Sequence, residues 1–410
     1  MRILFVVPYV PNLIRVRPYN LIRSLASRGH QLTVFTLCND AADESDAEAL
    51  SDFCYQVICL PLPRWRSWWN CLAALPTGVP LQSVYCWHPE MAKQLRHSIN
   101  GYGEQGYFDV AHVEHLRGVR YGLLINKLNP LLDQRLPVVW DSVDSISSLF
   151  RQASAQSRSV FGRWITRFEL GRTESYEGWL LSQFKHVLVT SPVDRQALLD
   201  LAVPDKSVAQ VNVLPNGVDL DYFFPNPEVT RDPETLVVTG KMSYHANVTM
   251  VLDLVQSVMP LIWEQRPAVK LFIVGKDPPA SIQNLNQHPS ITVTGTVLDI
   301  RPYLWRAATA LAPITYGVGI QNKILEAMAC ATPVVTSSQA TKALTAVSGH
   351  DLLVADGAEQ FADHVVRLIS DHELQRSLGM NGYAYVQAHH NWETIATRLE
   401  EIYASTIVPN

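Results

Sequence analysis

A repeated alternation of short apolar runs with helical stretches limits the fold of this chain more than any other feature. The first round of apolar runs comprises RILFVV (2–7), QLTVFTL (31–37), YQVICL (55–60), FDVAHV (108–113), PVVWD (137–141) and HVLVTS (186–191). The second comprises TLVVTG (235–240), VKLFIVG (269–275), ITVTG (291–295), ATALAPI (308–314), PVVTS (333–337) and DLLVA (351–355). Runs that are apolar at odd and even positions alike are typical of parallel strands covered on both faces. The alternation therefore predicts two doubly wound α/β domains.

The two rounds are separated by VNVLPNGVDLDYFFP (211–225), which is dense in Pro, Asn, Gly and Asp and predicts a linker. We expect a first domain over 1–205 and a second over 206–388. The remaining segment, 389–410, contains NWETIATRLEEIYAS (391–405), which has the pattern of an amphipathic helix.

Composition excludes several classes of protein. The formal net charge of -5 gives no electrostatic case for nucleic-acid binding. MRILFVVPYV is too short an apolar run for a signal peptide, and no segment approaches the ~20 continuous apolar residues of a spanning helix. Six cysteines show neither CxxC nor zinc spacing, which favours free thiols over disulfides. We therefore expect a soluble, cytoplasmic chain.

The segment GVGIQNKILEAMACATPVV (317–335) follows the run ATALAPI, so it lies where a strand of an open parallel sheet ends and ligands bind. Gly317 and Gly319 would let the backbone approach a phosphate, and the helix that follows offers free N–H groups. Lys323 would add a cation there. Glu326 interrupts an apolar helix, so it either forms a surface pair with Lys323 or lines a site.

Four segments carry a resemblance to one family. LPNGVDLDYFFP (214–225) and GIQNKILEAMACATPVV (319–335) together resemble the interdomain segment and the donor-binding helix of retaining glycosyltransferases of the GT-B fold, family 4. TGKMSYHANV (239–248) and FIVGKDP (272–278) are similar to the strand ends that flank the donor phosphates in that family. The stretch 294–323 is similar to a subgroup associated with bacterial exopolysaccharide assembly. The resemblance is strongest over 210–390.

The resemblance implies two Rossmann-like domains facing across a cleft, with the C-terminal helix returning to the first domain. It implies transfer of a sugar from a nucleotide donor, UDP- or GDP-linked, to a hydroxyl of a glycan, a lipid-linked acceptor or a small molecule. Retention of anomeric configuration, domain closure and independence of cofactors and metals are implied with it. The implied donor-binding residues are Gly240, Lys241, Asn247, Gly275, Thr296, Val297, Gly317, Gly319, Ile320, Gln321, Asn322, Lys323 and Glu326.

Roles for these residues follow from the chemistry of the donor. Lys241, Lys323 and the helix terminus would stabilise the leaving nucleoside diphosphate. Glu326 would accept hydrogen bonds from the ribose hydroxyls. Where the family pattern places an acid that contacts the sugar, this chain has Val318. We therefore expect backbone N–H groups, Gln321 and Asn322 to take part in sugar recognition, or catalysis to be weak.

The first domain would hold the acceptor. Arg15 and Arg17 occupy the first strand–helix turn, where the family often has Gly-Gly, and would meet donor phosphate or an anionic acceptor unless they are surface arginines. In FDVAHVEHLRG (108–118) we prefer Glu114 and His115 as catalytic candidates. We expect the alternating His112 to face the core.

Two further features of the first domain leave alternatives open. Asp141 and Asp144 end another strand and either face the site or cap a helix. PRWRSWWN (63–70) combines arginine with tryptophan. That combination is typical of a surface that touches a lipid-linked glycan or a membrane, or of a buried apolar cluster.

Two other functions remain open from the sequence. One is a sugar-nucleotide epimerase or hydrolase of the same fold, which would need a clear acid/base set. The other is a non-catalytic nucleotide-sugar-binding partner, motivated by Val318 and by the missing glycines. A dehydrogenase is disfavoured because no GxGxxG follows the first strand.

Overall fold

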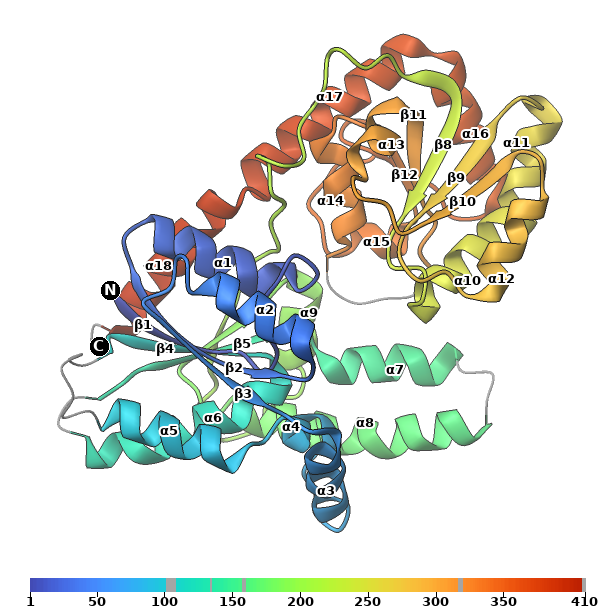
Figure 1. Ribbon diagram of the computed structural model, residues 1–410. Helices are drawn as coiled ribbons and strands as arrows, with labels where there is room; N and C mark the ends of the chain where they lie inside the picture. Colours follow the sequence, from blue (N-terminus) through green and yellow to red (C-terminus); the bar gives the residue numbers. More distant parts are fainter. Residues whose placement is uncertain (101–107, 133–134, 157–159, 316–319, 408–410) are drawn as a thin grey trace. The chain divides into compact units, whose positions relative to one another are not determined.

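The computed structural model describes residues 1–100, 108–132, 135–156, 160–315 and 320–407 (Figure 1). The chain divides into two compact units. The first unit contains Met1–Pro215 and Ile395–Asn410, and the second contains Asn216–Thr394. Each unit is built on one parallel sheet.

The sheet of the first unit has seven strands in the order β3-β2-β1-β4-β5-β6-β7. Their bounds are β1 Arg2–Val6, β2 Gln31–Cys38, β3 Gln56–Pro61, β4 Val110–Glu114, β5 Val138–Val143, β6 His186–Val189 and β7 Gln210–Val213. The sheet of the second unit has six strands in the order β10-β9-β8-β11-β12-β13. Their bounds are β8 Asp232–Thr239, β9 Lys270–Val274, β10 Ile291–Gly295, β11 Ala307–Ala312, β12 Val334–Thr336 and β13 Leu353–Val354.

Helices connect the strands, as parallel pairing requires. Those of the first unit are α1 Val16–Ser27, α2 Ala41–Leu50, α3 Arg64–Ala74, α4 Leu81–Tyr85, α5 Pro89–Ile99, α6 His115–Leu128, η1 Asn129–Leu131, α7 Ile146–Gln156, α8 Val160–Leu180 and α9 Pro192–Leu199. Those of the second unit are α10 His245–Asp253, η2 Leu254–Val258, α11 Met259–Gln265, α12 Ala280–Gln283, η3 Asn284–Gln287, α13 Arg301–Arg306, α14 Asn322–Ala329, α15 Ser338–Thr341, α16 Ala358–Ser370 and α17 His372–His389. The last helix, α18, spans Trp392–Ile407.

Strand order locates the position where each sheet is built to bind a ligand. In both units the first strand lies between the second and the fourth, so the direction of winding reverses beside it. A doubly wound sheet binds ligands at this reversal, beyond the carboxyl ends of its strands. The reversal falls between β1 and β4 in the first unit and between β8 and β11 in the second. The predicted pair of doubly wound parallel sheets is confirmed.

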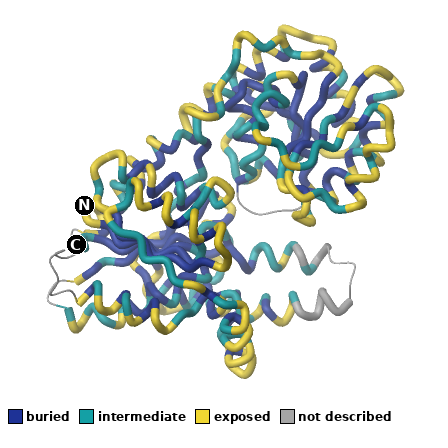
Figure 2. Tube along the Cα trace, in the orientation of Figure 1, coloured by how far each residue is buried: buried dark blue, intermediate teal, exposed yellow. Residues whose placement is uncertain are grey.

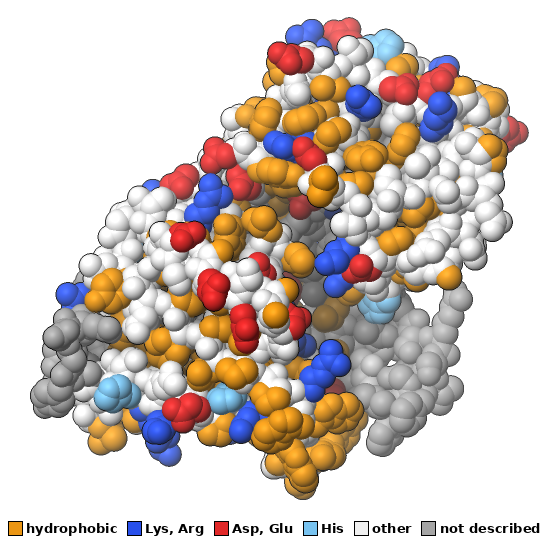
Figure 3. Space-filling view, in the orientation of Figure 1, with side chains coloured by type: hydrophobic (Ala, Val, Ile, Leu, Met, Phe, Trp, Pro, Cys, Tyr) orange, Lys and Arg blue, Asp and Glu red, His pale blue; other side chains and the backbone are white. Residues whose placement is uncertain are grey.

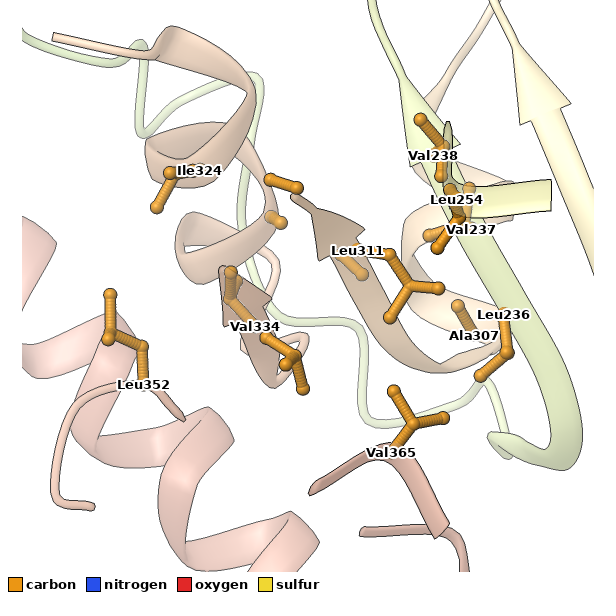
Figure 4. Close-up of a cluster of buried hydrophobic side chains, with 14 of the residues drawn as sticks. Leu236, Val237, Val238, Leu254, Ala307, Leu311, Ile324, Val334, Leu352 and Val365 are labelled. Atoms are coloured by element: carbon orange, nitrogen blue, oxygen red, sulfur yellow. The ribbon is translucent and has the colours of Figure 1, made fainter. Parts of the chain in front are cut away.

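The central strands of both sheets are among the most deeply buried parts of their units (Figure 2). Strands β1, β2, β4 and β11 are buried almost without interruption, which explains why their sequences are apolar on both faces. Figure 4 shows part of the second core, where Leu311 of β11 and Val334 of β12 share one cluster with Ile324 of α14. The helix that carries the predicted donor residues is therefore fixed to the core by its apolar side.

The boundary between the units lies beyond the one expected at 205/206. Strand β7 pairs with β6 and completes the first sheet. Its residues form the start of the segment that we expected to be linker. The chain leaves the first unit only after Pro215.

The final helix, α18, contributes to the first unit from Ile395 onward. Its buried residues include Leu399 and Tyr403. Arg28 forms a bidentate ion pair with Glu400, with nitrogen–oxygen distances of 2.8 and 2.7 Å, and His30 lies 2.6 Å from the same carboxylate. The C-terminal segment thus packs with the N-terminal one.

Among the described residues, the helical stretch His245–Gln265 is long and apolar enough, by length and composition, to cross a membrane. Its buried side includes Met250, Leu254 and Met259, which belong to the core of the second unit. Core helices commonly pass such a test, so the stretch is weak evidence for a membrane span.

Candidate functional site

Two glycines bring adjacent strand ends of the second unit together. Gly240 follows β8 with φ 145°, and Gly275 follows β9 with φ 157°. A Cβ on Gly275 would lie 1.7 Å from the carbonyl oxygen of Gly240. Only glycine permits this approach of the two strand ends beside the reversal.

Lys323 reaches the same rim from the start of α14. Its Nζ donates a hydrogen bond to Oδ1 of Asn247, while Nδ2 of Asn247 donates to the carbonyl of Lys241 over 2.8 Å. A Cβ on Gly240 would lie 3.5 Å from Nζ of Lys323. The structure therefore brings Gly240, Asn247 and Lys323 together across β8 and β11. The side chain of Lys241 is exposed.

Burial changes the protonation of the two ionisable groups on α14. It lowers the pKa of Lys323 to about 8, although Glu326 opposes the shift. It raises the pKa of Glu326 to about 7, against the effect of Lys323. Within the described residues, no hydrogen bond or ion pair joins these two side chains. The interpretation of a simple surface pair is therefore not supported.

A feature that the sequence did not indicate holds the other end of α14. The guanidinium of Arg231, just before β8, donates to the carbonyls of Cys330 and Ala331 over 3.1 and 2.7 Å. It also donates to the carbonyls of Leu304 and Ala307 over 3.1 and 2.9 Å. A cation at a helix C-terminus is favourable because it compensates the last free carbonyls.

The remaining predicted donor residues occupy varied positions. Thr296 is exposed after β10, whereas Val297 is partly buried against the core. Ile320 is buried, Gln321 is the N-cap of α14, and Asn322 is its first residue with Oδ1 buried. Gly317, Val318 and Gly319 lie outside the described residues.

A separate pocket of about 350 Å³ lies at the reversal of the first sheet. Its lining includes the loop after β1, the start of α1, the residue after β2, the end of β4 and the start of α6. The residues include Tyr9, Arg15, Arg17, Asn39, Glu114 and Arg117. This places a concavity of mixed apolar and polar lining, with three arginines and one acid, where the topology predicts a ligand.

Glu114 ends β4 inside this pocket and is only 1% exposed. Its Oε1 accepts a hydrogen bond from the hydroxyl of Tyr9 over 3.1 Å, whereas Oε2 is buried without a partner. Burial, with a contribution from Asp141, raises the pKa of Glu114 to about 8. His115 follows with φ 63°, its ring edge toward Tyr9, and burial lowers its pKa. Of the two catalytic candidates of the first unit, Glu114 lines the pocket, whereas His115 is its neighbour in the chain and is not part of the lining.

Arg17, which lines the pocket, forms a buried ion pair with Asp141. Nη2 of Arg17 lies 2.8 Å from Oδ2 of Asp141, and Nη1 donates to the carbonyl of Leu214 over 3.0 Å. Although burial raises the pKa of Asp141, Arg17 and His112 hold it at about 2. Both side chains are at most 4% exposed, which favours a structural role at the end of the first unit.

His112, expected in the core, is fully buried and stacks on Phe5 with ring centroids 4.1 Å apart. Its Nε2 lies 3.5 Å from Oδ2 of Asp141, and its Nδ1 lies 2.8 Å from the hydroxyl of Tyr403. The expectation for His112 is confirmed. Tyr403 of α18 was not indicated by the sequence, because its partner lies far away along the chain.

Arg15 and Asp144 are each held by a partner within the first unit. Nη1 of Arg15 contacts Oδ1 of Asp43 over 3.0 Å, and its guanidinium lies 5.2 Å from the ring centre of Tyr9. Asp144 accepts a hydrogen bond from the hydroxyl of Thr190 over 2.9 Å. Burial, helped by Asp194, raises the pKa of Asp144 to about 7.

Within the described residues, no group of three or more metal-binding side chains is present.

Comparison with known families decides the classification. A model described as "Glycosyl transferase 4-like domain" matches residues 14–217, and one described as "Glycosyl transferases group 1" matches 233–371. The chain belongs to this glycosyltransferase family. Together the two matches cover most of both units.

Individual relatives of this family-4/group-1 glycosyltransferase are distant. The gpi3 subunit of phosphatidylinositol N-acetylglucosaminyltransferase from Schizosaccharomyces pombe is 24% identical over 241 residues, which cover 56% of this chain and 51% of that protein. The chain spans about half the length of the curated relatives it matches.

Solved structures share the fold over the whole chain. Sucrose-phosphate synthase from Thermosynechococcus elongatus has a TM-score of 0.69 at 19% identity, covering 99% of this chain and 98% of that one. Anabaena HepE, solved in complex with UDP-glucose, has a TM-score of 0.66 at 14% identity, covering 99% and 100%. These likenesses support the GT-B fold, with two Rossmann-like domains.

Proposed function

We propose that this glycosyltransferase moves a sugar from a nucleotide-sugar donor to a hydroxyl acceptor with retention of anomeric configuration. The observation that carries the proposal is the grouping of Gly240, Asn247 and Lys323 at the reversal of the second sheet. A glycine backbone without side chains and a cation suit a diphosphate, which accumulates negative charge as the sugar leaves.

The donor is a UDP- or GDP-sugar held by the second unit. A solved protein of the same fold contains UDP-glucose, which supports this class of donor. Lys323, with Lys241 from the end of β8, neutralises the departing diphosphate. Glu326, one turn into α14, accepts from the ribose hydroxyls, and Val297 offers an apolar contact to the base. Gln321 and Asn322 contact the sugar where the family pattern has its acid.

The acceptor binds in the pocket of the first unit. Its hydroxyl approaches Tyr9 and Glu114 of the pocket lining, with His115 next to Glu114 in the chain, while Arg15 and Arg117 supply positive charge at the same pocket. The acceptor attacks the anomeric carbon on the face from which the nucleoside diphosphate departs, and the acceptor proton passes to that leaving group. No metal ion is needed for these steps, because the cations come from side chains.

Within the family we assign the chain to polysaccharide biosynthesis, in the subgroup that resembles exopolysaccharide transferases. We also assign it to the cytoplasm. All six cysteines are free, and burial raises the pKa of the Cys54, Cys59 and Cys86 thiols. Free thiols of this kind suit a reducing compartment.

The test begins with calorimetry of UDP and GDP binding and continues with turnover of a panel of UDP- and GDP-sugars, with and without EDTA. Lys323→Ala should lower turnover by about 10²- to 10³-fold, as loss of one charge-stabilising donor does. Lys270→Ala, an exposed lysine of β9, is the matched control and should match wild type. Proton NMR of the product would report its anomeric configuration.

The other outcomes have distinct meanings. Nucleotide binding without transfer would favour a non-catalytic binding partner, and release of free sugar or of its epimer would favour a hydrolase or an epimerase. Wild-type turnover by Lys323→Ala would exclude this lysine from the donor site.

A further inference from the structure

Helix α3 exposes a continuous row of large apolar side chains. Trp65 is 57% exposed, Trp68 71% and Trp69 65%. Leu72 and Leu75 continue the row at 51% and 47%. Their spacing places them on one face of the helix, because residues three and four apart are neighbours on a helix surface. The alternative of a buried tryptophan cluster is wrong.

The opposite face of α3 holds the helix to the protein. Ser67 and Ala74 are buried there, and Nδ2 of Asn70 donates to the carbonyl of Trp87 over 2.8 Å. Nη2 of Arg172 donates to the carbonyls of Ala74 and Thr77, both over 2.6 Å. The small and polar side chains thus face inward and the tryptophans face outward. A surface helix that only stabilises a core has the reverse arrangement.

The charged side chains of the segment that carries this face have one sign. The sequence contains no Asp or Glu from 53 to 89. Arg64 is exposed at the start of α3, and the guanidinium of Arg66 lies 4.9 Å from the ring centre of Trp65. Figure 3 shows hydrophobic side chains gathered over α3 with basic side chains beside them. A large apolar patch of this kind marks an interaction surface.

We propose that α3 docks this protein on a bilayer that contains anionic lipid. Tryptophan is favoured at the level of lipid headgroups, where its ring is buried and its N–H stays near water. Arginine beside an apolar helix face adds attraction to anionic headgroups, and a helix with this composition lies in the plane of the interface. The absence of acids from 53 to 89 suits a negative surface, and in a symmetric contact between two copies the same segment would offer the arginines no acid.

This docking goes beyond the proposed function and does not require it, because binding to vesicles is measured without donor or acceptor. It would bring the acceptor-binding unit to the surface where lipid-linked acceptors reside. Absence of sugar transfer would not affect the docking result. Absence of vesicle binding would likewise not affect the test of sugar transfer.

The experiment is co-sedimentation of the full chain with vesicles of phosphatidylcholine and phosphatidylglycerol in equal amounts, and with vesicles of phosphatidylcholine alone. Wild type should sediment with the anionic vesicles and be released by salt. Trp68→Ser combined with Trp69→Ser should lower binding by at least about tenfold, since two interfacial aromatic anchors are lost. The control pair, Val347→Ser with Met380→Ser, removes exposed apolar side chains of the second unit and should bind as wild type.

A second measurement does not depend on a variant that folds. Brominated lipids should quench tryptophan fluorescence of the wild-type protein in anionic vesicles. Absence of vesicle binding by wild type, or equal binding by the tryptophan variant, would overturn the proposal. So would a wild-type dimer that fails to bind vesicles and becomes monomeric on these substitutions, because α3 would then be an interface between copies.

Discussion

At the scale of single residues, Glu114 couples the stability of the first unit to pH. Its pKa is about 8 in the folded protein against an ordinary value of 4.5. Between these pH values the folded state holds a proton that the unfolded state has lost. The free energy of unfolding therefore falls as pH rises through this window, by about 1.4 kcal/mol for each unit of the pKa difference.

Glu114→Gln should remove this contribution, because a neutral amide replaces the protonated acid beside Tyr9 and Asp141. The check is urea unfolding of both proteins at several pH values across this window, with tryptophan fluorescence as the signal. Wild type should lose stability relative to the variant on going from about pH 5 to about pH 8. Parallel pH profiles for the two proteins would contradict the burial argument.

Asn247 offers a second prediction at this scale. It accepts a hydrogen bond from Lys323 and donates one to the carbonyl of Lys241, so it orients the lysine. Asn247→Asp should raise the pKa of Lys323 by placing a carboxylate beside it, but it should also neutralise the cation that faces the diphosphate. We expect UDP affinity to fall by about tenfold or more, and to fall less in Asn247→Ala.

Calorimetry of UDP binding by the three proteins would measure this effect. If Asn247→Asp bound UDP as tightly as wild type, the charge of Lys323 would not contribute to nucleotide binding.

At the residue scale, the sequence indicated residues that belong to a motif and gave no signal for contacts between residues far apart in the chain. Lys323 and Asn247 lie far apart in the chain, yet each belonged to a segment with its own pattern, and the structure brings them together. No motif near Arg231 or Tyr403 indicates which residues they contact. The contacts of Arg231 and Tyr403 form only when helices and strands that are distant in the sequence pack together in the folded chain.

At the scale of elements, the carboxyl ends of β8 and β9 depend on a glycine. Gly275→Ala would place a Cβ 1.7 Å from the carbonyl oxygen of Gly240, so one strand end must shift. We expect a loss of several kcal/mol in the stability of the second unit, in the range of severe steric substitutions. Gly295→Ala is the matched control, because its Cβ meets nothing within 4 Å and only φ 67° disfavours it.

Thermal unfolding would compare the two variants, with Gly295→Ala expected to lose about 1 kcal/mol. A similar loss in both would mean that backbone conformation, rather than the close approach of β8 and β9, makes glycine necessary at Gly275.

Helix α14 depends on Arg231 in a different way. Arg231→Met keeps the apolar stem but leaves the carbonyls of Cys330, Ala331, Leu304 and Ala307 without their cation. Because unsatisfied buried carbonyls cost about 1–3 kcal/mol, the second unit should lose at least that much stability. Hydrogen exchange should increase in α14 most of all.

Arg266→Met, at an exposed position, is the control and should exchange like wild type. Unchanged protection of α14 in Arg231→Met would show that its apolar side alone fixes the helix.

At the scale of the whole molecule, the sequence predicted both sheets because buried parallel strands leave a continuous apolar signal. Each apolar run of the two rounds overlaps an observed strand. Strand β7 was missed because its short VNV lies against LPNGVD, where turn residues dominate the pattern. The exposed face of α3 also could not be deduced, since tryptophans at helical spacing suit a core and a surface equally well.

The return of α18 makes the stability of the first unit depend on the end of the chain. A protein ending after Thr394 lacks the part of α18 that belongs to the first unit, including Tyr403 and Glu400. His112 then loses its hydroxyl partner, and the ion pairs of Arg28 and His30 are lost with the apolar cover of Leu399. We expect β1 and β4 to lose protection from hydrogen exchange, while the second unit keeps its protection and its affinity for UDP. A chain ending after Ile407 is the control and should behave as wild type. Full protection of β1 and β4 in the shorter chain would mean that the first sheet is stable without its C-terminal helix.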